Sequence, residues 1–219
     1  MRFDIPPVTL GLLILNIVVF LLMTLTGGEW LVIHAALWPF GPERLAGYTA
    51  AGAPVMVGFH VWQLLTYAFM HGGWTHIAFN MFALYMFGGP IEHLLGTRHF
   101  IVYYVVCTVV AALAQLLVVH FFTGGFYPTI GASGAIFGLL LAFGVMYPHV
   151  KLFLIFFPVP ISAWIFVIGY MVLELFLGVT GTQAGVAHFA HLGGAAGGFV
   201  LLQYWRGKLP VKPKRVLTR

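Results

Sequence analysis

Charged residues are scarce in this chain of 219 amino acids. Asp, Glu, Lys and Arg together make up 7% of the sequence, whereas soluble proteins contain about 25%. Hydrophobic residues account for 61%. This composition excludes an ordinary soluble domain and predicts a polytopic membrane protein.

Cysteine and acidic residues are equally rare. The one cysteine, Cys107, lies within an apolar run, so an intramolecular disulfide is excluded and the thiol is explained by packing. The acidic side chains are limited to Asp4, Glu29, Glu43, Glu92 and Glu174. Internal repeats are also absent, which argues against a transporter built from inverted repeats.

Long apolar stretches dominate what remains. Six of them have the length of about 17–25 residues that a membrane-spanning helix needs: Val8–Thr26, Ile77–Leu95, Phe100–Phe122, Ile130–Tyr147, Leu152–Val179 and Val186–Trp205. The stretch Pro54–Met70 is a possible seventh span, but it contains His60 and Gln63 and is interpreted as interfacial structure. The predicted fold is therefore an all-α membrane bundle with six transmembrane helices.

The positive charges predict how this bundle is oriented. With six spans both termini share a side, and nine of the ten Lys and Arg residues then face that side, Arg44 being the exception. The positive-inside rule makes this side cytoplasmic. We expect a short cytoplasmic N-terminus (residues 1–7), a membrane domain (8–205) and a basic cytoplasmic tail (206–219), with the first span retained rather than cleaved. The basic tail suits anionic lipid headgroups and needs no nucleic-acid partner.

Two polar residues with complementary chemistry lie within the apolar runs. Ser133 follows Gly131 and Ala132, and His191 precedes a glycine-rich segment. Two glycines four residues apart follow each of them: 134 and 138 after Ser133, and 194 and 198 after His191. A helix face made of such small residues lets a neighbouring helix approach closely. Both residues are predicted near the outer ends of their helices, so Ser133 and His191 can form a hydrogen bond. Alternatively, the glycines serve packing alone and the polar groups bond backbone carbonyls.

A third cluster opens the second predicted span. His76 and Asn80 are separated by four residues and share a helical face. Both can donate hydrogen bonds toward the negative charge that develops on an attacked carbonyl. Their alternative role is polar contact between helices.

These residues predict peptide hydrolysis within the membrane. His191 would act as general base on Ser133, the serine would form an acyl-enzyme, and water would release it. Glu92 lies at the wrong end of its span to assist. Glu174 has a suitable depth to orient His191, although a hydrogen bond between helices is the favoured explanation for it.

A metal site is the competing interpretation. His188 precedes His191 by three residues, and His71 and His76 add further imidazoles, as a metalloprotease or zinc transporter would require. However, there is no His-Glu-x-x-His motif and carboxylates are scarce. We therefore expect no metal ion and no cofactor.

The clusters His71–Asn80, Gly131–Gly138 and Ala190–Gly198, together with Gly88-Gly89-Pro90-Ile91-Glu92, resemble the rhomboid family of intramembrane serine proteases. The resemblance implies a dyad of Ser133 and His191. It also implies an oxyanion hole made by His76, Asn80 and the Ser133 backbone N–H. Phe137 matches the position of an aromatic residue that packs on the catalytic histidine, and Trp62-Gln63 stands nearest to a Trp-Arg pair of that family.

We expect the substrates to be single-span membrane proteins and the chain to be a multi-pass protein of the plasma membrane of a prokaryote. Rhomboid-like folds can also lose catalysis and serve to bind transmembrane segments. A non-catalytic binding protein is therefore the alternative function.

Overall fold

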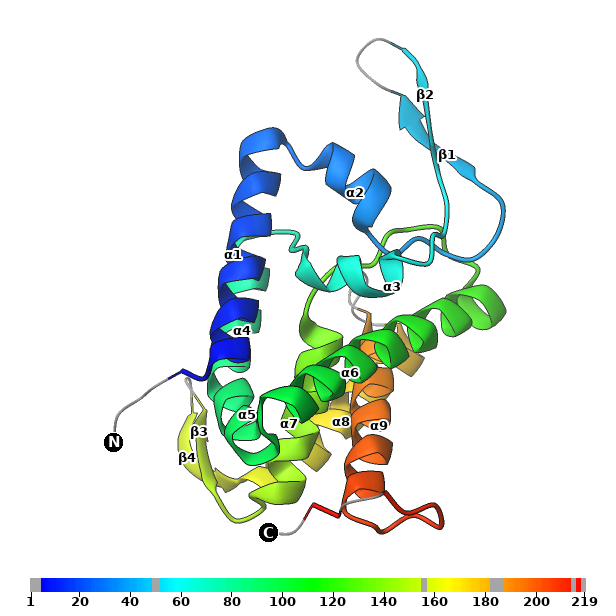
Figure 1. Cartoon of the computed structure of the whole chain (residues 1–219). Coiled ribbons are helices and arrows are strands. Elements are labelled where there is room, and N and C mark those ends of the chain that lie inside the picture. The colour runs from blue at the N-terminus through cyan, green and yellow to red at the C-terminus, as the bar shows by residue number, and fades with distance from the viewer. Residues whose placement is uncertain (1–4, 49–51, 155–156, 182–186, 214–215, 218–219) are drawn as a thin grey trace.

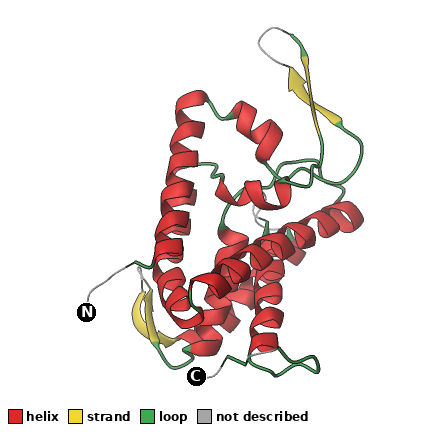
Figure 2. Ribbon diagram, in the orientation of Figure 1, coloured by secondary structure: helices red, strands yellow, loops and turns green. Residues whose placement is uncertain are grey.

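The computed structural model describes residues 5–48, 52–154, 157–181, 187–213 and 216–217. Helices make up most of this part of the chain (Figures 1 and 2), which confirms the predicted all-α class. The helical elements, in chain order, are α1 (Pro7–Thr26), α2 (Glu29–Ala35), α3 (Gln63–Thr66), η1 (Tyr67–Phe69), α4 (Trp74–Ala83), η2 (Leu84–Gly88), α5 (Gly89–Leu95), α6 (Thr97–Val118), η3 (Val119–Thr123), α7 (Ser133–Met146), α8 (Ala163–Thr180) and α9 (His188–Trp205). Two short antiparallel hairpins accompany them in the described residues, β1 (Arg44–Tyr48) with β2 (Pro54–Val57) and β3 (Lys151–Leu154) with β4 (Phe157–Ser162).

Each of the six predicted spans contains a helix. Among the described residues, three helices are long and apolar enough to cross a membrane: α1, α6 continued by η3, and α8. Helix α7 is apolar but shorter. Large apolar side chains of α1 and α8, such as Ile14, Leu22, Ile168 and Val172, are exposed on the protein surface. Such a surface suits lipid rather than water.

The second predicted span, Ile77–Leu95, is one continuous helix made of α4, η2 and α5. Its middle, Leu84–Gly88, is a π-helical turn. Pro90 lies two residues after the end of this turn. Proline has no backbone N–H, and its ring clashes with the carbonyl four residues earlier in an α-helix. The wider turn accommodates the proline without ending the helix.

The fifth predicted span, Leu152–Val179, is wrong at its beginning. Residues 151–162 contribute β3 and β4, and α8 begins only at Ala163. Pro158 and Pro160 explain the difference, because proline disfavours a helix interior but is tolerated in an edge strand. Apolar composition alone did not distinguish this hairpin from the start of a helix.

Helix α7 lies at the centre of the bundle. Most of its residues are buried, and it packs against α6, α8 and α9. The glycines at 134 and 194 bring the backbones of α7 and α9 into contact, since a Cβ atom added to Gly194 would collide with the carbonyl oxygen of Gly134. A Cβ atom at Gly138 would collide with the buried Sγ of Cys107, and one at Gly198 with the hydroxyl of Tyr103. The glycine faces therefore set the helix spacing around Ser133.

Helix α1 is attached to the bundle at its first turn. Its N-terminal amides have no local side-chain cap. Instead the carboxylate of Glu92, in α5, accepts hydrogen bonds from the backbone N–H of Val8 (3.0 Å), the backbone N–H of Thr9 (2.7 Å) and the Thr9 hydroxyl (2.8 Å). A negative charge at a helix N-terminus is stabilising.

The arrangement of the ends agrees with an even number of crossings. The start of α1, the end of α9 and the β3–β4 hairpin lie toward one end of the bundle, whereas the β1–β2 hairpin projects from the other (Figure 1). Lys151 of β3 is thus on the same side as both ends, as the charge distribution predicts. The orientation relative to the cytoplasm stays a prediction.

The segment between α1 and α4, residues 27–73, is called the first loop here. The region predicted as interfacial, Pro54–Met70, contains β2, α3 and η1. Gln63 is fully buried: its Oε1 accepts from the backbone N–H groups of Trp38 and His60, and its Nε2 donates to the carbonyl of Gly58. Trp62 donates its Nε1–H to the carbonyl of His34. The Trp62-Gln63 pair therefore holds this loop together.

Candidate active site

Ser133 is the first residue of α7, and the loop before it is fixed to the first loop. Leu37 and Thr129 exchange backbone hydrogen bonds of 3.0 and 2.9 Å, and the N–H of Gly131 donates to the carbonyl of Tyr67 at 3.0 Å. Gly131 has φ +128°, and a Cβ atom there would lie 2.8 Å from His76 Nε2. Only glycine fits this position without strain. At the start of a helix, the N–H of Ser133 has no partner within the helix and is available to a ligand.

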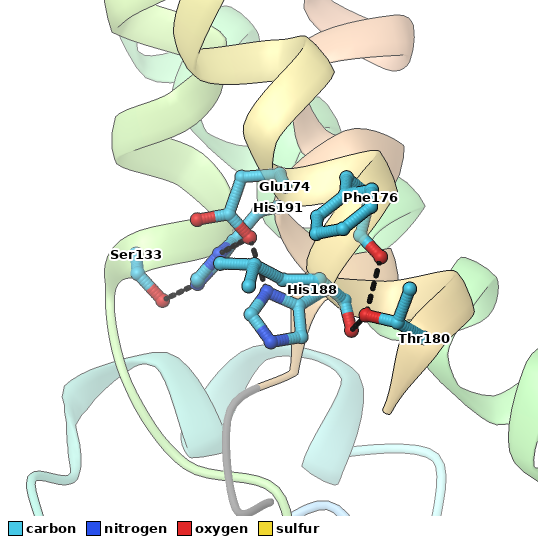
Figure 3. A network of polar contacts seen from close by, with 7 residues as sticks. Ser133, Glu174, Phe176, Thr180, His188 and His191 are labelled. Atoms are coloured by element: carbon cyan, nitrogen blue, oxygen red, sulfur yellow. Dashed lines mark hydrogen bonds and ion pairs between the residues drawn. The ribbon is translucent and has the colours of Figure 1, made fainter. Parts of the chain in front are cut away.

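Ser133 meets His191 across the α7–α9 contact. The Ser133 Oγ lies 2.8 Å from His191 Nε2, although 58 residues separate them in sequence (Figure 3). The structure thus brings together the two residues that were paired by their predicted depth. Both belong to helices whose glycines touch, so the short distance follows from the backbone packing described above.

The ring of Phe137 packs against one face of the His191 imidazole. Its ring is stacked on the ring of His191, with 4.3 Å between centroids and 3° between planes. Tyr170 of α8 also packs against Phe137, with ring centroids 4.9 Å apart. This stack restricts the rotation of His191 about its side chain.

Glu174 joins the site from α8. Its Oε2 lies 2.9 Å from His191 Nδ1 and 2.7 Å from His188 Nδ1, and the three side chains are buried (Figure 3). As the sequence favoured, Glu174 forms a hydrogen bond between helices. Its partner is Nδ1 of His191, whose Nε2 contacts Ser133. In the sequence only the depth of Glu174 in its span hinted at this position.

The same three residues are a possible metal-ligand set. Their donor atoms lie within 4.8 Å of one another, and in the described part of the chain this is the one such group of three or more His, Cys, Asp or Glu residues. His71 and His76 are not in it. Glu174, one of the few carboxylates in the sequence, supplies the acidic member of this group.

His76 and Asn80 lie on α4 beside Ser133. The backbone N–H of Gly72 donates to His76 Nδ1 at 3.3 Å, so the proton of a neutral imidazole is on Nε2. That Nε2 and the Ser133 Oγ both lie next to Gly131: a Cβ atom there would be 2.8 Å from the first and 3.7 Å from the second. Asn80 is buried and its Nδ2 donates to the carbonyl of His76 at 3.1 Å.

His71 is buried next to this group, outside the predicted span. Its ring meets that of His76 edge to face, with centroids 4.9 Å apart. Burial, with the neighbouring His76, lowers the pKa of His71 to about 4. The His71 side chain is therefore neutral at physiological pH.

A cavity of about 1240 Å³ opens onto these polar groups. Its lining includes Ser133, His191, His76 and Asn80. The remainder is mainly apolar, and it includes side chains of α4 and η2 (Phe79, Phe82 and Met86) and of α8 (Phe166 and Tyr170). The arrangement combines a serine bonded to an imidazole, nearby N–H donors and an apolar cavity, which is what acyl transfer on an apolar peptide requires.

Comparison with known proteins gives a consistent result. Residues 58–207 match the family model for the rhomboid domain. The mitochondrial rhomboid protein 1 of Saccharomyces cerevisiae is 32% identical over 163 residues, which cover 68% of this chain and 42% of that protein. The rhomboid protease GlpG of Enterobacter sp. is 33% identical over 134 residues (61% of this chain, 41% of the relative). The rhomboid protease GluP of Bacillus subtilis is 28% identical over 195 residues (89% and 34%). In each case the matched region is less than half of the relative's length.

Proposed function

The chain belongs to the rhomboid family, and from this premise we propose that it is an intramembrane serine endopeptidase that cuts transmembrane segments of other proteins. The observation that carries the proposal is the 2.8 Å contact between Ser133 Oγ and His191 Nε2. A serine hydroxyl is a weak nucleophile unless a neighbouring base takes its proton. His191 is the base within reach.

In the proposed reaction, Ser133 Oγ attacks the carbonyl carbon of the scissile peptide bond while its proton moves to His191 Nε2. The tetrahedral intermediate collapses when His191 returns this proton to the leaving amine, which gives an acyl-enzyme. Water, deprotonated by His191, then attacks the ester and regenerates the Ser133 hydroxyl. No cofactor is required for these steps.

Negative charge on the substrate oxygen needs donors in both tetrahedral intermediates. The backbone N–H of Ser133 and the Nε2–H of His76 support this role, because one belongs to the nucleophile itself and the other lies beside Gly131. Asn80, which lines the same cavity, is proposed as the third donor. Its amide would have to turn from the carbonyl of His76, since Nδ2 donates there in this structure.

The protein is an integral membrane protein, and its substrates are proposed to reach Ser133 from the lipid. The apolar side chains that α4 and α8 place along the cavity suit a transmembrane helix that enters between them. The proposed substrates are single-span membrane proteins. We further propose a plasma membrane of a prokaryote as the location, with both termini and the basic tail in the cytoplasm.

A rhomboid-like protein that only binds transmembrane segments is the alternative. Such a binding protein would need the cavity but no hydrogen bond between Ser133 and His191. The 2.8 Å contact between these two residues therefore favours a catalytic function.

The test is cleavage of a tagged single-span reporter by the purified chain in lipid vesicles, with Ser133→Ala and His191→Ala as variants. We expect each variant to abolish cleavage and the double variant to be no slower than either, because the two residues act as a unit. Reaction with a fluorophosphonate, which labels activated serines, should follow the same pattern. Cleavage by the Ser133→Ala variant, or no labelling of the wild-type chain, would refute the proposal.

A further inference from the structure

The Glu174 carboxylate fixes which nitrogen of His191 carries the proton. An ionised carboxylate accepts hydrogen bonds and cannot donate. The 2.9 Å contact with His191 Nδ1 therefore requires an N–H on Nδ1. In the neutral imidazole this leaves a lone pair on Nε2, the atom that lies 2.8 Å from the Ser133 hydroxyl. General-base catalysis requires this tautomer.

We propose that Glu174 is a positioning residue that holds His191 in this tautomer and orientation, so that Ser133, His191 and Glu174 form one hydrogen-bonded chain rather than a dyad. The inference rests on the proposed protease function. During catalysis through these three hydrogen-bonded residues, the Ser133 proton moves to His191 Nε2 and then leaves with the amine. Glu174 takes no proton; it stabilises the imidazolium that exists between these two steps.

His188 supports the carboxylate. Its Nδ1 lies 2.7 Å from the same Oε2, so one oxygen accepts two N–H groups. A buried carboxylate without donors is strongly disfavoured and tends to become protonated. A protonated Glu174 could donate to His191 Nδ1, which would favour the tautomer whose Nε2–H points at Ser133. His188 therefore keeps Glu174 in its accepting state.

The geometry distinguishes this role from simple attachment of α8 to α9. Attachment needs only one of the two histidines, and the bond to His188 already provides it. The second bond reaches the residue whose opposite nitrogen meets the nucleophile (Figure 3). Packing of Phe137 against the ring constrains its plane, but stacking on an aromatic face does not choose between tautomers.

The experiment compares Glu174→Gln and Glu174→Asp in the purified chain, with the reporter cleavage assay and with the rate of fluorophosphonate labelling. Glu174→Gln keeps the size but offers an amide that can donate to Nδ1. We expect kcat to fall by about 100-fold or more, with KM changed less than about 3-fold, because the variant loses both the reactive tautomer of His191 and the partner of the imidazolium, and neither binds the substrate. Glu174→Asp is shorter but still accepts only, so it should retain more activity than Glu174→Gln. His188→Gln should fall between the wild type and Glu174→Gln.

Glu92→Gln is the matched control, since Glu92 is also buried and also accepts hydrogen bonds from another helix, but it lies outside the site. It should lower Tm and leave kcat within about 3-fold of the wild type. If Glu174→Gln retains near wild-type kcat, the positioning role is wrong. It is also wrong if activity follows Tm, with Glu174→Gln more active than Glu174→Asp, as a merely structural contact would require.

The two proposals fail in different ways. If the wild-type chain labels and cleaves, and Ser133→Ala does neither, the protease function stands whatever Glu174 does. If the wild-type serine is not labelled, no activated nucleophile exists and both proposals are refuted.

Discussion

Gly194→Ala tests whether the close approach of α7 and α9 is what sets the distance between Ser133 and His191. The added Cβ atom would lie 2.6 Å from the carbonyl carbon of Gly134 and would collide with its oxygen. Carbon atoms pack at about 3.5–4.0 Å, so the two helices must separate by roughly 1 Å. Gly194 is three residues from His191, and Gly134 follows Ser133, so the separation acts directly on the pair.

The substitution is expected to reduce stability only slightly but to reduce kcat strongly. Overpacking costs about 1–3 kcal/mol, and the better helix propensity of alanine returns about 1 kcal/mol, so the net loss of stability is about 0–2 kcal/mol. Catalysis is more sensitive, because a displacement of about 1 Å can reduce the rate about 100-fold. We therefore expect kcat to fall by about 100-fold in a chain that still folds.

The assay is reporter cleavage by the purified variant in lipid vesicles, with thermal unfolding measured on the same preparation. Gly169→Ala is the control, since Gly169 lies in α8 and an added Cβ atom would meet nothing within 4 Å. It should leave kcat unchanged and raise stability by up to about 1 kcal/mol. A Gly194→Ala variant that folds and cleaves within about 3-fold of the wild-type kcat would show that the glycine contact does not govern the site.

Three further predictions concern the oxyanion donors, the topology and His71. His76→Ala and Asn80→Ala should each lower kcat by roughly 10- to 1,000-fold with little change in KM, because the donors act on charge that develops in the transition state; wild-type kcat in both would assign these residues to packing. The topology is tested with Thr123→Cys and Lys212→Cys, each in a Cys107→Ala background. In intact cells an impermeant maleimide should label the cysteine at position 123 but not the one at position 212. Labelling of position 212 from outside would require another topology. The pKa of His71 is lowered from 6.5 to about 4 in the folded chain, so the unfolded chain binds the proton first as the pH falls. Stability present above pH 6.5 should therefore decline between pH 6.5 and 4, and thermal unfolding of His71→Gln should lack this decline; an equal decline in both chains would assign it to other groups.

The sequence predicted those parts of the fold that depend on composition and local spacing. The apolar runs identified every long helix, and the glycines after Ser133 and His191 predicted that their helices lie close together. These signals are readable because a residue's position along an apolar run gives its depth, and because glycine is one of the few residues that lets backbones touch. The pairing of Ser133 with His191 follows from their matched depth together with these glycine faces.

Other features of the fold depend on how each helix is rotated about its own axis and on contacts between distant segments. Residues 152–162 are apolar enough to suggest the start of a span, and only their prolines indicate the hairpin. The partner of Glu174 could not be inferred, because α8 is apolar on every side and its sequence does not tell which face meets α9. The contact of Glu174 with His188 and His191 arises from the packing of α8 against α9, which no local pattern records.

The bond between Glu92 and the first turn of α1 has a consequence for biogenesis. The amide of Thr9 and its carboxylate partner are 83 residues apart in sequence, and a chain is synthesised from its N-terminus. The first turn of α1 is therefore made long before the group that caps it. During translation the leading amides of α1 therefore have no Glu92 carboxylate to donate to until α5 has been made. Insertion of the first helix and its incorporation into the bundle are thus separate events in time.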